Sequence, residues 1–273
     1  MSDSVLKPNP SPEGEGLNRI DGLHVVRRGE GAPLLFLVGL GGRAEFWMPQ
    51  FDRFGPTRDC ISFDHRKTGD SLPSDITTTV QAMADDAVRL LDALGIDRID
   101  VIGHSLGGAI AQHIAVFHPG RVNRLVLSAS WAGPTPWFLD LFALRKRVLH
   151  ENGPRDYMLQ GNLLGNPGWW TFANHAVMMA GIEARLAAFA GVEIECERMD
   201  AVTGHDLRDR VGDIAAETLI ICARDDGITP LPLSEELAAR IPGARIDVLA
   251  TGNHFAPACV ADDWAAPVAA FLS

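Results

Sequence analysis

Short apolar runs alternate with helical stretches through the first half of the chain. Strands are predicted at 23–28, 33–38, 59–64, 98–103 and 122–128, and continuous apolar runs among them are typical of strands buried on both faces. Apolar residues at helical spacing predict helices over 77–94, ended by Gly95, and over 106–117. This strand–helix–strand order predicts an α/β fold with a mostly parallel central sheet flanked by helices.

The pattern changes between about 132 and 205, where aromatic residues crowd into helical stretches broken by Gly-Pro and Asn-Pro-Gly. The alternation then resumes, with strands predicted at 218–223 and 245–250 and helices at 232–240 and 263–272. We therefore expect a helical cap, 132–205, inserted into one α/β domain made of 17–131 and 206–273. The Pro-, Ser-, Gly- and Glu-containing segment 1–16 predicts a mobile N-terminal arm.

Composition narrows the class of partner. The chain has 273 residues, of which 47% are hydrophobic and 22% charged, an ordinary globular mixture. Its net charge of −11 argues against nucleic acid or an anionic membrane surface as a partner. The four cysteines show no CxxC spacing, which suggests neither a disulfide framework nor a zinc site. We expect a cytoplasmic monomer or homodimer that acts on a small molecule and needs no metal or cofactor.

The strongest chemical signal is the sequence Gly103-His104-Ser105-Leu106-Gly107. It lies directly after a predicted strand and directly before a predicted helix. Such a turn needs small neighbours on both sides of the serine, and it lifts the hydroxyl above the sheet. A glycine-rich turn with an incidental serine is the alternative, but the flanking strand and helix favour Ser105 as a nucleophile.

A serine hydroxyl needs a base, and the base needs an acid that holds its tautomer. His254 follows the last predicted strand, where this arrangement places its base. Asp225 and Asp226 follow the strand at 218–223 and compete for the acid role. The order Ser, Asp, His suits either aspartate, and the other one could hold the loop by backbone hydrogen bonds.

The loop that follows the strand at 33–38 reads Gly39-Leu40-Gly41-Gly42. An oxyanion hole in this arrangement uses two backbone N–H groups, which we assign to Leu40 and Leu106. The glycines, Gly39 first, would let the backbone approach a substrate closely. A plain turn or a phosphate loop is the alternative, but a phosphate loop would end in Lys-Ser/Thr, and this one continues into Arg43.

Together these residues resemble the α/β-hydrolase superfamily from about residue 23 to the C-terminus. The second aspartate of the loop matches the family pattern, so the resemblance implies Asp226 as the acid and leaves Asp225 to hold the loop. The turn at 63–69 is similar to a D-x-R-G-x-G motif of that family, and Trp47 and Gln50 match after the oxyanion loop. Two departures are Val38, where a histidine is usual, and Lys67, where a glycine is usual. Neither position belongs to the triad, although both bear on loop polarity and substrate orientation.

Shorter pieces, among them the Ser130-Trp131 segment, are similar to two groups within the superfamily. These are the aminoacrylate (carbamate-type) hydrolases and the 3-oxoadipate enol-lactonases, and both resemblances imply small, anionic substrates. Such a substrate calls for a cation near the cleft, preferably an arginine. The candidates for substrate contact are Gly39, Arg43, Trp131, Arg145 and His175.

The leading hypothesis is hydrolysis of a small amide, carbamate, enol-lactone or ester by acyl transfer. The same triad could instead cleave a carbon–carbon bond in a vinylogous diketone or support cofactor-free perhydrolase chemistry. A ligand sensor without turnover is the alternative from another class. It would need an exposed apolar patch on the cap, which Trp169 and Trp170 could supply.

Overall fold

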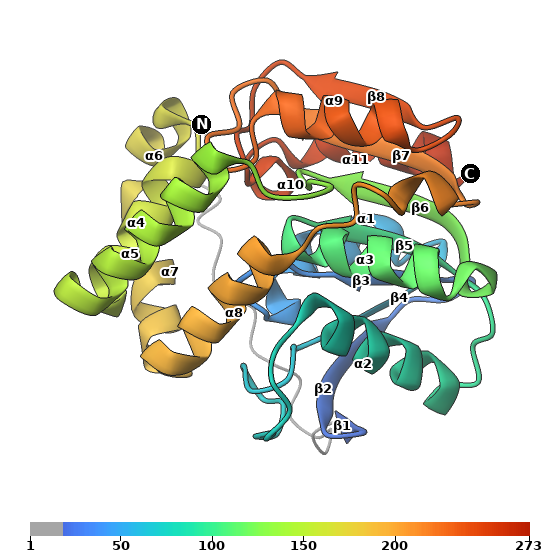
Figure 1. The fold of residues 1–273 in the computed structure, drawn as a ribbon, viewed down its shortest axis with the longest axis horizontal. Helices are drawn as coiled ribbons and strands as arrows, with labels where there is room; N and C mark the ends of the chain where they lie inside the picture. Colours follow the sequence, from blue (N-terminus) through green and yellow to red (C-terminus); the bar gives the residue numbers. More distant parts are fainter. Residues whose placement is uncertain (1–18) are drawn as a thin grey trace, which may run out of the picture.

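The computed structural model describes residues 19–273, so the arm expected at 1–16 lies outside the described residues. An eight-stranded sheet with the order β1-β2-β4-β3-β5-β6-β7-β8 forms the centre (Figure 1). Strands β3 to β8 run parallel, and β1 and β2 add an antiparallel edge. The strands are Arg19–Ile20, Leu23–Arg28, Ala32–Leu37, Arg58–Phe63, Ile99–His104, Val122–Ser128, Glu217–Ala223 and Arg245–Leu249.

Helices cover both faces of the sheet, which explains the continuous apolar runs of its central strands. One face packs against α2 (Val80–Ala93), α3 (Leu106–Phe117) and α9 (Leu231–Arg240). The other packs against α1 (Met48–Phe54) and α11 (Ala261–Leu272), with the short α10 (Ala256–Cys259) before α11. The predicted α/β fold with a mostly parallel sheet is therefore confirmed.

Five helices stand between β6 and β7 and pack beside the sheet (Figure 1, left). We call them the cap. They are α4 (Pro136–Asn152), α5 (Pro154–Gly165), α6 (Gly168–Ala173), α7 (His175–Ala187) and α8 (Val192–Gly204). Gly153 has a φ of 85° between α4 and α5, and Pro154 starts α5, so the Gly-Pro pair predicted as a break ends one helix and begins the next.

Two local details differ from the sequence prediction. Helix α2 begins at Val80 rather than at residue 77, because the Thr79 side chain accepts a hydrogen bond from the N–H of Ala82 and caps the first turn. Helix α1 was not predicted. It has only seven residues, too few for a periodic apolar pattern to stand out from the loop around it.

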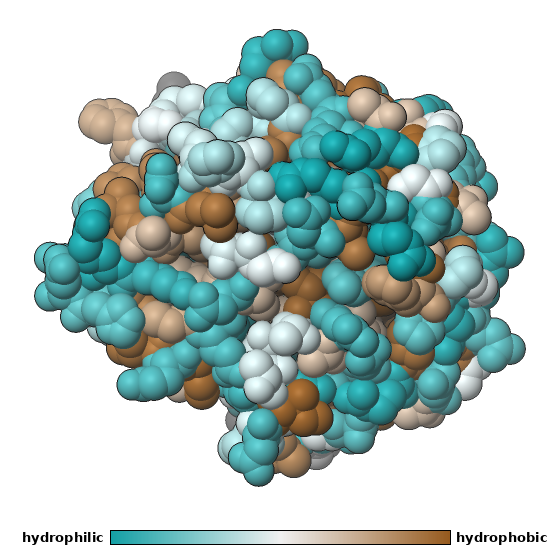
Figure 2. All heavy atoms as spheres, viewed as in Figure 1, coloured by the Kyte–Doolittle hydropathy of each residue, from teal (hydrophilic) through white to brown (hydrophobic). Residues whose placement is uncertain are grey.

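Apolar side chains reach the surface of the cap among hydrophilic ones, as the left side of Figure 2 shows. The exposed large apolar residues of the cap are Trp137, Leu139, Leu144, Leu163, Trp169, Phe172 and Val177. Within residues 19–273, no helix is both long enough and apolar enough to cross a membrane.

The turn between β5 and α3 is packed so closely that it excludes side chains at two glycines. A Cβ on Gly107 would lie 2.1 Å from the carbonyl oxygen of Leu37, and one on Gly103 would lie 2.3 Å from the carbonyl oxygen of Gly107. Both contacts are with backbone, which cannot move aside as a flexible side chain could. The two glycines of the G-x-S-x-G motif are therefore required by contact distances.

We expect Gly107→Ala to lower the free energy of unfolding by at least about 2 kcal/mol, because overpacking against fixed backbone forces the helix away from the sheet. Urea denaturation measures this change. Gly181→Ala is the matched control, since a Cβ there meets nothing within 4 Å and α7 gains helix propensity. Equal stability of the two variants would contradict the steric argument.

A buried histidine lies where the cap meets the core. His205 is 2% exposed, and its ring lies 5.7 Å from the ring of Trp131 and 5.5 Å from that of His113. Burial, reinforced by the nearby His113, lowers the pKa of His205 to about 3. The folded protein therefore keeps this ring neutral while the unfolded chain takes up a proton below about pH 6.5.

We therefore expect His205 to make unfolding easier as the pH falls below 6.5, by about 1.4 kcal/mol per pH unit until its folded pKa is reached. His205→Phe removes the titrating group. The stability difference between this variant and wild type should shift by about 3 kcal/mol in favour of the variant from pH 7 to pH 4. Parallel stability curves over this range, measured by urea denaturation, would show that the ring is protonated in the folded state.

Candidate active site

Ser105 occupies the turn between β5 and α3 with a φ of 54° and a ψ of −119°, a conformation rare for any residue with a side chain. Its N–H donates to the carbonyl of Ser128, 2.8 Å away, at the end of the neighbouring strand β6. Its carbonyl accepts from the N–H of Gly108 and the hydroxyl of Ser130. The backbone of the turn is thus held from both sides, as a strained nucleophile position requires.

His254 and Asp226 lie against each other although 28 residues separate them. Nδ1 of His254 is 3.0 Å from Oδ2 of Asp226, and both side chains are buried. The other carboxylate oxygen accepts the N–H groups of Ile228 and Thr229 at 2.8 and 2.7 Å. These bonds fix the orientation of the carboxylate, so its Oδ2 can hold the imidazole with a proton on Nδ1 and leave Nε2 free as a base.

Asp225 makes a different set of contacts. Its carboxylate accepts the hydroxyl of Thr251 and the N–H of Asn253, both at 2.8 Å. These two bonds tie the β7 loop to the loop that carries His254. The structure therefore places Asp226 at the imidazole and Asp225 in the loop, as the sequence prediction has them.

Two residues near the base were missed by the sequence reasoning. The hydroxyl of Thr229 lies 2.9 Å from Asp226 Oδ2 and 3.1 Å from His254 Nδ1, so it adds a polar contact on the acid–base pair. The Oδ1 of Asn253 accepts the N–H groups of Gly227 and His254, while its Nδ2 donates to the carbonyl of Asn166 in the cap. The residue type fits the position, because Asn253 has a φ of 51° and asparagine tolerates this region better than most residues. An asparagine in a loop is too common in sequences to have marked this role.

His104 also contacts the base. Its ring centroid lies 4.9 Å from that of His254, and its other side stacks on Phe46 at 5.2 Å. Burial, reinforced by the charge that His254 can carry, holds the pKa of His104 well below its usual range. A neutral His104 places no second positive charge beside His254 when the base is protonated.

The loop that follows β3, the predicted oxyanion loop, lies close to Ser105. A Cβ on Gly39 would lie 3.2 Å from the Cβ of Ser105, so the two backbones nearly touch. The N–H groups of Leu40 and Leu106 have no hydrogen-bond partner among residues 19–273, which leaves both free to donate. The Leu106 group also stands at the N-terminus of α3, where the helix dipole favours negative charge.

An arginine of the cap that the sequence reasoning missed holds this loop. Arg198 on α8 is fully buried and donates from Nε and Nη2 to the carbonyl of Leu40, at 2.8 and 2.6 Å. Its Nη2 also lies 3.1 Å from Nδ1 of His65. Burial lowers the pKa of Arg198, and burial together with this guanidinium lowers that of His65. Nothing in the sequence around Arg198 marks it, because its partner lies 158 residues away.

The other predicted contact residues are spread over three places. Arg43 lies beside the oxyanion loop with its Nη2 3.4 Å from Glu45. Trp131 is buried and packs on Phe138, with ring centroids 4.9 Å apart, at the base of the cap. Arg145 is buried inside the cap.

His175 is the candidate that the structure places apart. It is the first residue of α7 and is exposed on the surface, so its side chain does not join the group around Ser105. The physical reason is that α7 turns this end outward while it buries Met178 and Ile182.

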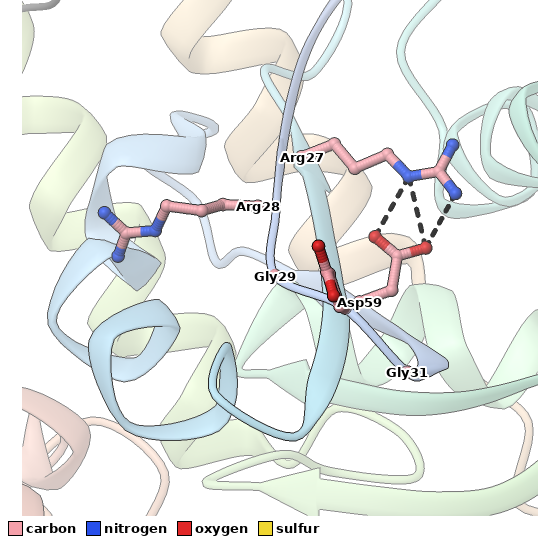
Figure 3. A pocket seen from close by; sticks show the side chains of 6 residues that line it. Arg27, Arg28, Gly29, Gly31 and Asp59 are labelled. Atoms are coloured by element: carbon pink, nitrogen blue, oxygen red, sulfur yellow. Dashed lines mark hydrogen bonds and ion pairs between the residues drawn. The ribbon is translucent and has the colours of Figure 1, made fainter.

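Two other places that could bind a ligand, a trio of possible metal ligands and a surface hollow, contain side chains that already make structural contacts. In the described part of the chain, one trio of possible metal ligands occurs, His24, Asp64 and Asp70. Asp64 already accepts the N–H groups of Ala44 and Asp70 there. A surface hollow of about 460 Å³ at the start of β3 and β4 is crossed by the Arg27–Asp59 ion pair (Figure 3). It lies at the opposite ends of the parallel strands from Ser105.

The three-layer fold and the turn at Ser105 agree with what a comparison of this chain with known protein families finds. Residues 32–152 match the family model described as alpha/beta hydrolase fold. The chain belongs to this family, and it is an enzyme of the hydrolase class.

Two curated relatives cover most of the chain. A Caulobacter vibrioides protein named "Putative carbamate hydrolase RutD" is 34% identical over 245 residues, which are 87% of this chain and 90% of that one. A protein of the same name from Azorhizobium caulinodans is 35% identical over 232 residues, 85% of this chain and 88% of that one. Among solved structures, the enol-lactonase of Burkholderia xenovorans LB400 has a TM-score of 0.83 at 23% identity and covers 92% of this chain and 96% of its own.

The two neighbouring aspartates give a sharp test of the site. We expect Asp226→Asn to lower kcat by about 10⁴-fold, because an amide at this position favours the wrong imidazole tautomer. Asp225→Asn is the matched control and should lower kcat by less than about tenfold, since it weakens two loop contacts and leaves the imidazole contact intact. Steady-state kinetics with a chromogenic ester measures both. Equal losses, or a larger loss in Asp225→Asn, would reverse the assignment.

Proposed function

We propose that this hydrolase works by acyl transfer through Ser105, His254 and Asp226. The Ser105 hydroxyl attacks the substrate carbonyl while its proton passes to Nε2 of His254, and Asp226 holds Nδ1–H. The N–H groups of Leu40 and Leu106 stabilise the oxyanion. The histidine then gives its proton to the leaving group, and a water molecule, deprotonated by the same histidine, releases the acid from the serine ester.

The observation that carries this proposal is the buried contact of 3.0 Å between His254 and Asp226. The ring of His254 also lies 4.9 Å from the ring of His104, the residue directly before Ser105, whose turn is strained and requires glycines on both sides. A buried acid–imidazole pair beside such a serine is the arrangement that activates a hydroxyl nucleophile.

We further propose that the substrate is a small anionic metabolite with a carbamate or other C–N bond at its acyl carbon. The two relatives named for carbamate hydrolysis, each at least 34% identical over most of the chain, support this choice. Lactone or ester hydrolysis uses the same steps. The solved enol-lactonase, at 23% identity, adds only the fold to this argument.

The exposed apolar residues of the cap fit the sensor hypothesis, but no described contact shows what would cover them. The hydrolase proposal also accounts for the acid–imidazole pair, which a sensor would not need.

The test compares wild type with Ser105→Ala on p-nitrophenyl acetate and butyrate, a muconolactone-type enol-lactone, carbamate, aminoacrylate generated in situ and a vinylogous diketone. We expect one compound to be turned over well above the rest, with at least about a 10³-fold loss in Ser105→Ala because the nucleophile is gone. Retention of full activity by Ser105→Ala would contradict the nucleophilic mechanism. Preference for the diketone would replace the C–N substrate with a carbon–carbon one.

A further inference from the structure

The buried charges inside the cap do not balance. Arg145 on α4 is 7% exposed and Arg198 on α8 is fully buried. The nearest carboxylate to Arg198 is that of Glu195, whose Oε2 lies 4.0 Å from the Arg198 Nε. Arg145 takes part in no ion pair within residues 19–273. A buried charge without a partner is strongly disfavoured, so a structural role alone does not account for Arg145.

Both guanidinium groups also keep a free donor. Nη1 of Arg145 and Nη1 of Arg198 are buried, and neither has a hydrogen-bond partner among the described residues. Buried N–H groups are nearly always paired in folded proteins, and a charged donor left alone is more costly than a neutral one. Arg145 and Arg198 lie on two cap helices that pack together, α4 and α8. Two buried, unpaired charged donors on these helices are suited to binding an anion.

Aromatic side chains and a glycine surround the guanidinium of Arg145. The Cζ lies 4.6 Å from the ring centroid of Tyr157 and 6.0 Å from that of Phe142, so aromatic rings hold the group by cation–π contact. A Cβ on Gly161 would lie 3.1 Å from Nη2, and the glycine avoids that crowding. The ring faces accept none of the in-plane N–H donors, and of Tyr157 only the hydroxyl can accept one, so these rings satisfy the charge only in part.

A chain of contacts joins this group to the oxyanion loop. The Tyr157 hydroxyl donates to Oε1 of Glu195 at 2.6 Å. Glu195 stands three residues before Arg198 on α8, and Arg198 holds the carbonyl of Leu40. The unbalanced charge is therefore part of the layer that packs on the loop beside Ser105.

We propose that Arg145, aided by Nη1 of Arg198, binds the carboxylate or carbamate group of the substrate. This proposal rests on the proposed function, because it assigns the anionic end of the same substrate. A guanidinium offers two parallel N–H donors that match a carboxylate, which a lysine cannot do. The subsite would select anionic over neutral acyl groups, and it would tie the substrate to the cap rather than to the core.

The first experiment measures selectivity with two esters, 4-nitrophenyl hemisuccinate and 4-nitrophenyl butyrate, which differ in the charge of the acyl end. We expect Arg145→Met to lower kcat/KM for the hemisuccinate by about tenfold or more and to change that for the butyrate by less than about twofold. Arg147→Met is the matched control, because Arg147 is exposed on the same helix. An unchanged ratio of the two kcat/KM values in Arg145→Met would overturn the proposal.

The second experiment does not depend on catalysis. Succinate is added to Ser105→Ala, and the change in Tm is measured with and without Arg145→Met. We expect succinate to raise Tm by a few degrees in Ser105→Ala and to have no effect in the double variant, because ligand binding stabilises only the form that binds. Without succinate, Arg145→Met should not lower Tm, since it removes an unpaired buried charge.

The size of the succinate shift decides the outcome. A shift that persists in the double variant would make Arg145 a structural residue and would overturn the proposal. If the methionine variant fails to fold, Arg145→Lys keeps the charge and removes the paired donors, so a reduced shift supports the proposal and an undiminished one rejects it. Loss of the Ser105 mechanism would appear in the ester assay alone and would leave the succinate result intact.

Discussion

The close approach of α3 to the backbone at the end of β3 is the constraint on which the rest of the structure depends. Gly107 lies against the carbonyl of Leu37, and Ser105 takes a positive φ to make the turn. A non-glycine residue held in such a conformation costs of order 1–3 kcal/mol, which the surrounding packing must offset. In return, the serine, the N-terminus of α3 and the loop at Gly39 are brought to one point.

The cap is joined to the catalytic loops by polar contacts as well as by packing. The N–H of Phe255, directly after His254, donates to the carbonyl of Gly165 in the cap at 2.9 Å. Asn253 reaches the same segment through Asn166, and Arg198 reaches the oxyanion loop from α8. The proposed base and one proposed oxyanion donor are therefore both positioned from the cap. The helices that would select the substrate also hold the groups that would act on it, so substitutions in the cap should affect kcat and KM together.

Most of the sheet could be predicted because its signals are local. A run such as residues 219–223 is apolar throughout, and in the structure it is part of a strand with both faces covered. The G-x-S-x-G motif was equally local, since contact distances allow only glycine at 103 and 107. Helix α1 escaped prediction because it is short, and His175 was grouped with the site because sequence alone does not show which way a helix end turns.

The sequence by itself determined the order of strands and helices, the nucleophile turn and the residues available as base and acid. These follow from side-chain periodicity and steric limits that act over a few residues. Only the tertiary structure decided which aspartate meets His254, that Arg198 holds the carbonyl of Leu40, and that Arg145 is buried without a counterion. Such contacts join segments up to 158 residues apart, and they depend on how whole helices pack against the sheet. No pattern along the chain carries that information, because a charged residue looks the same in sequence whether it faces water or a buried carbonyl.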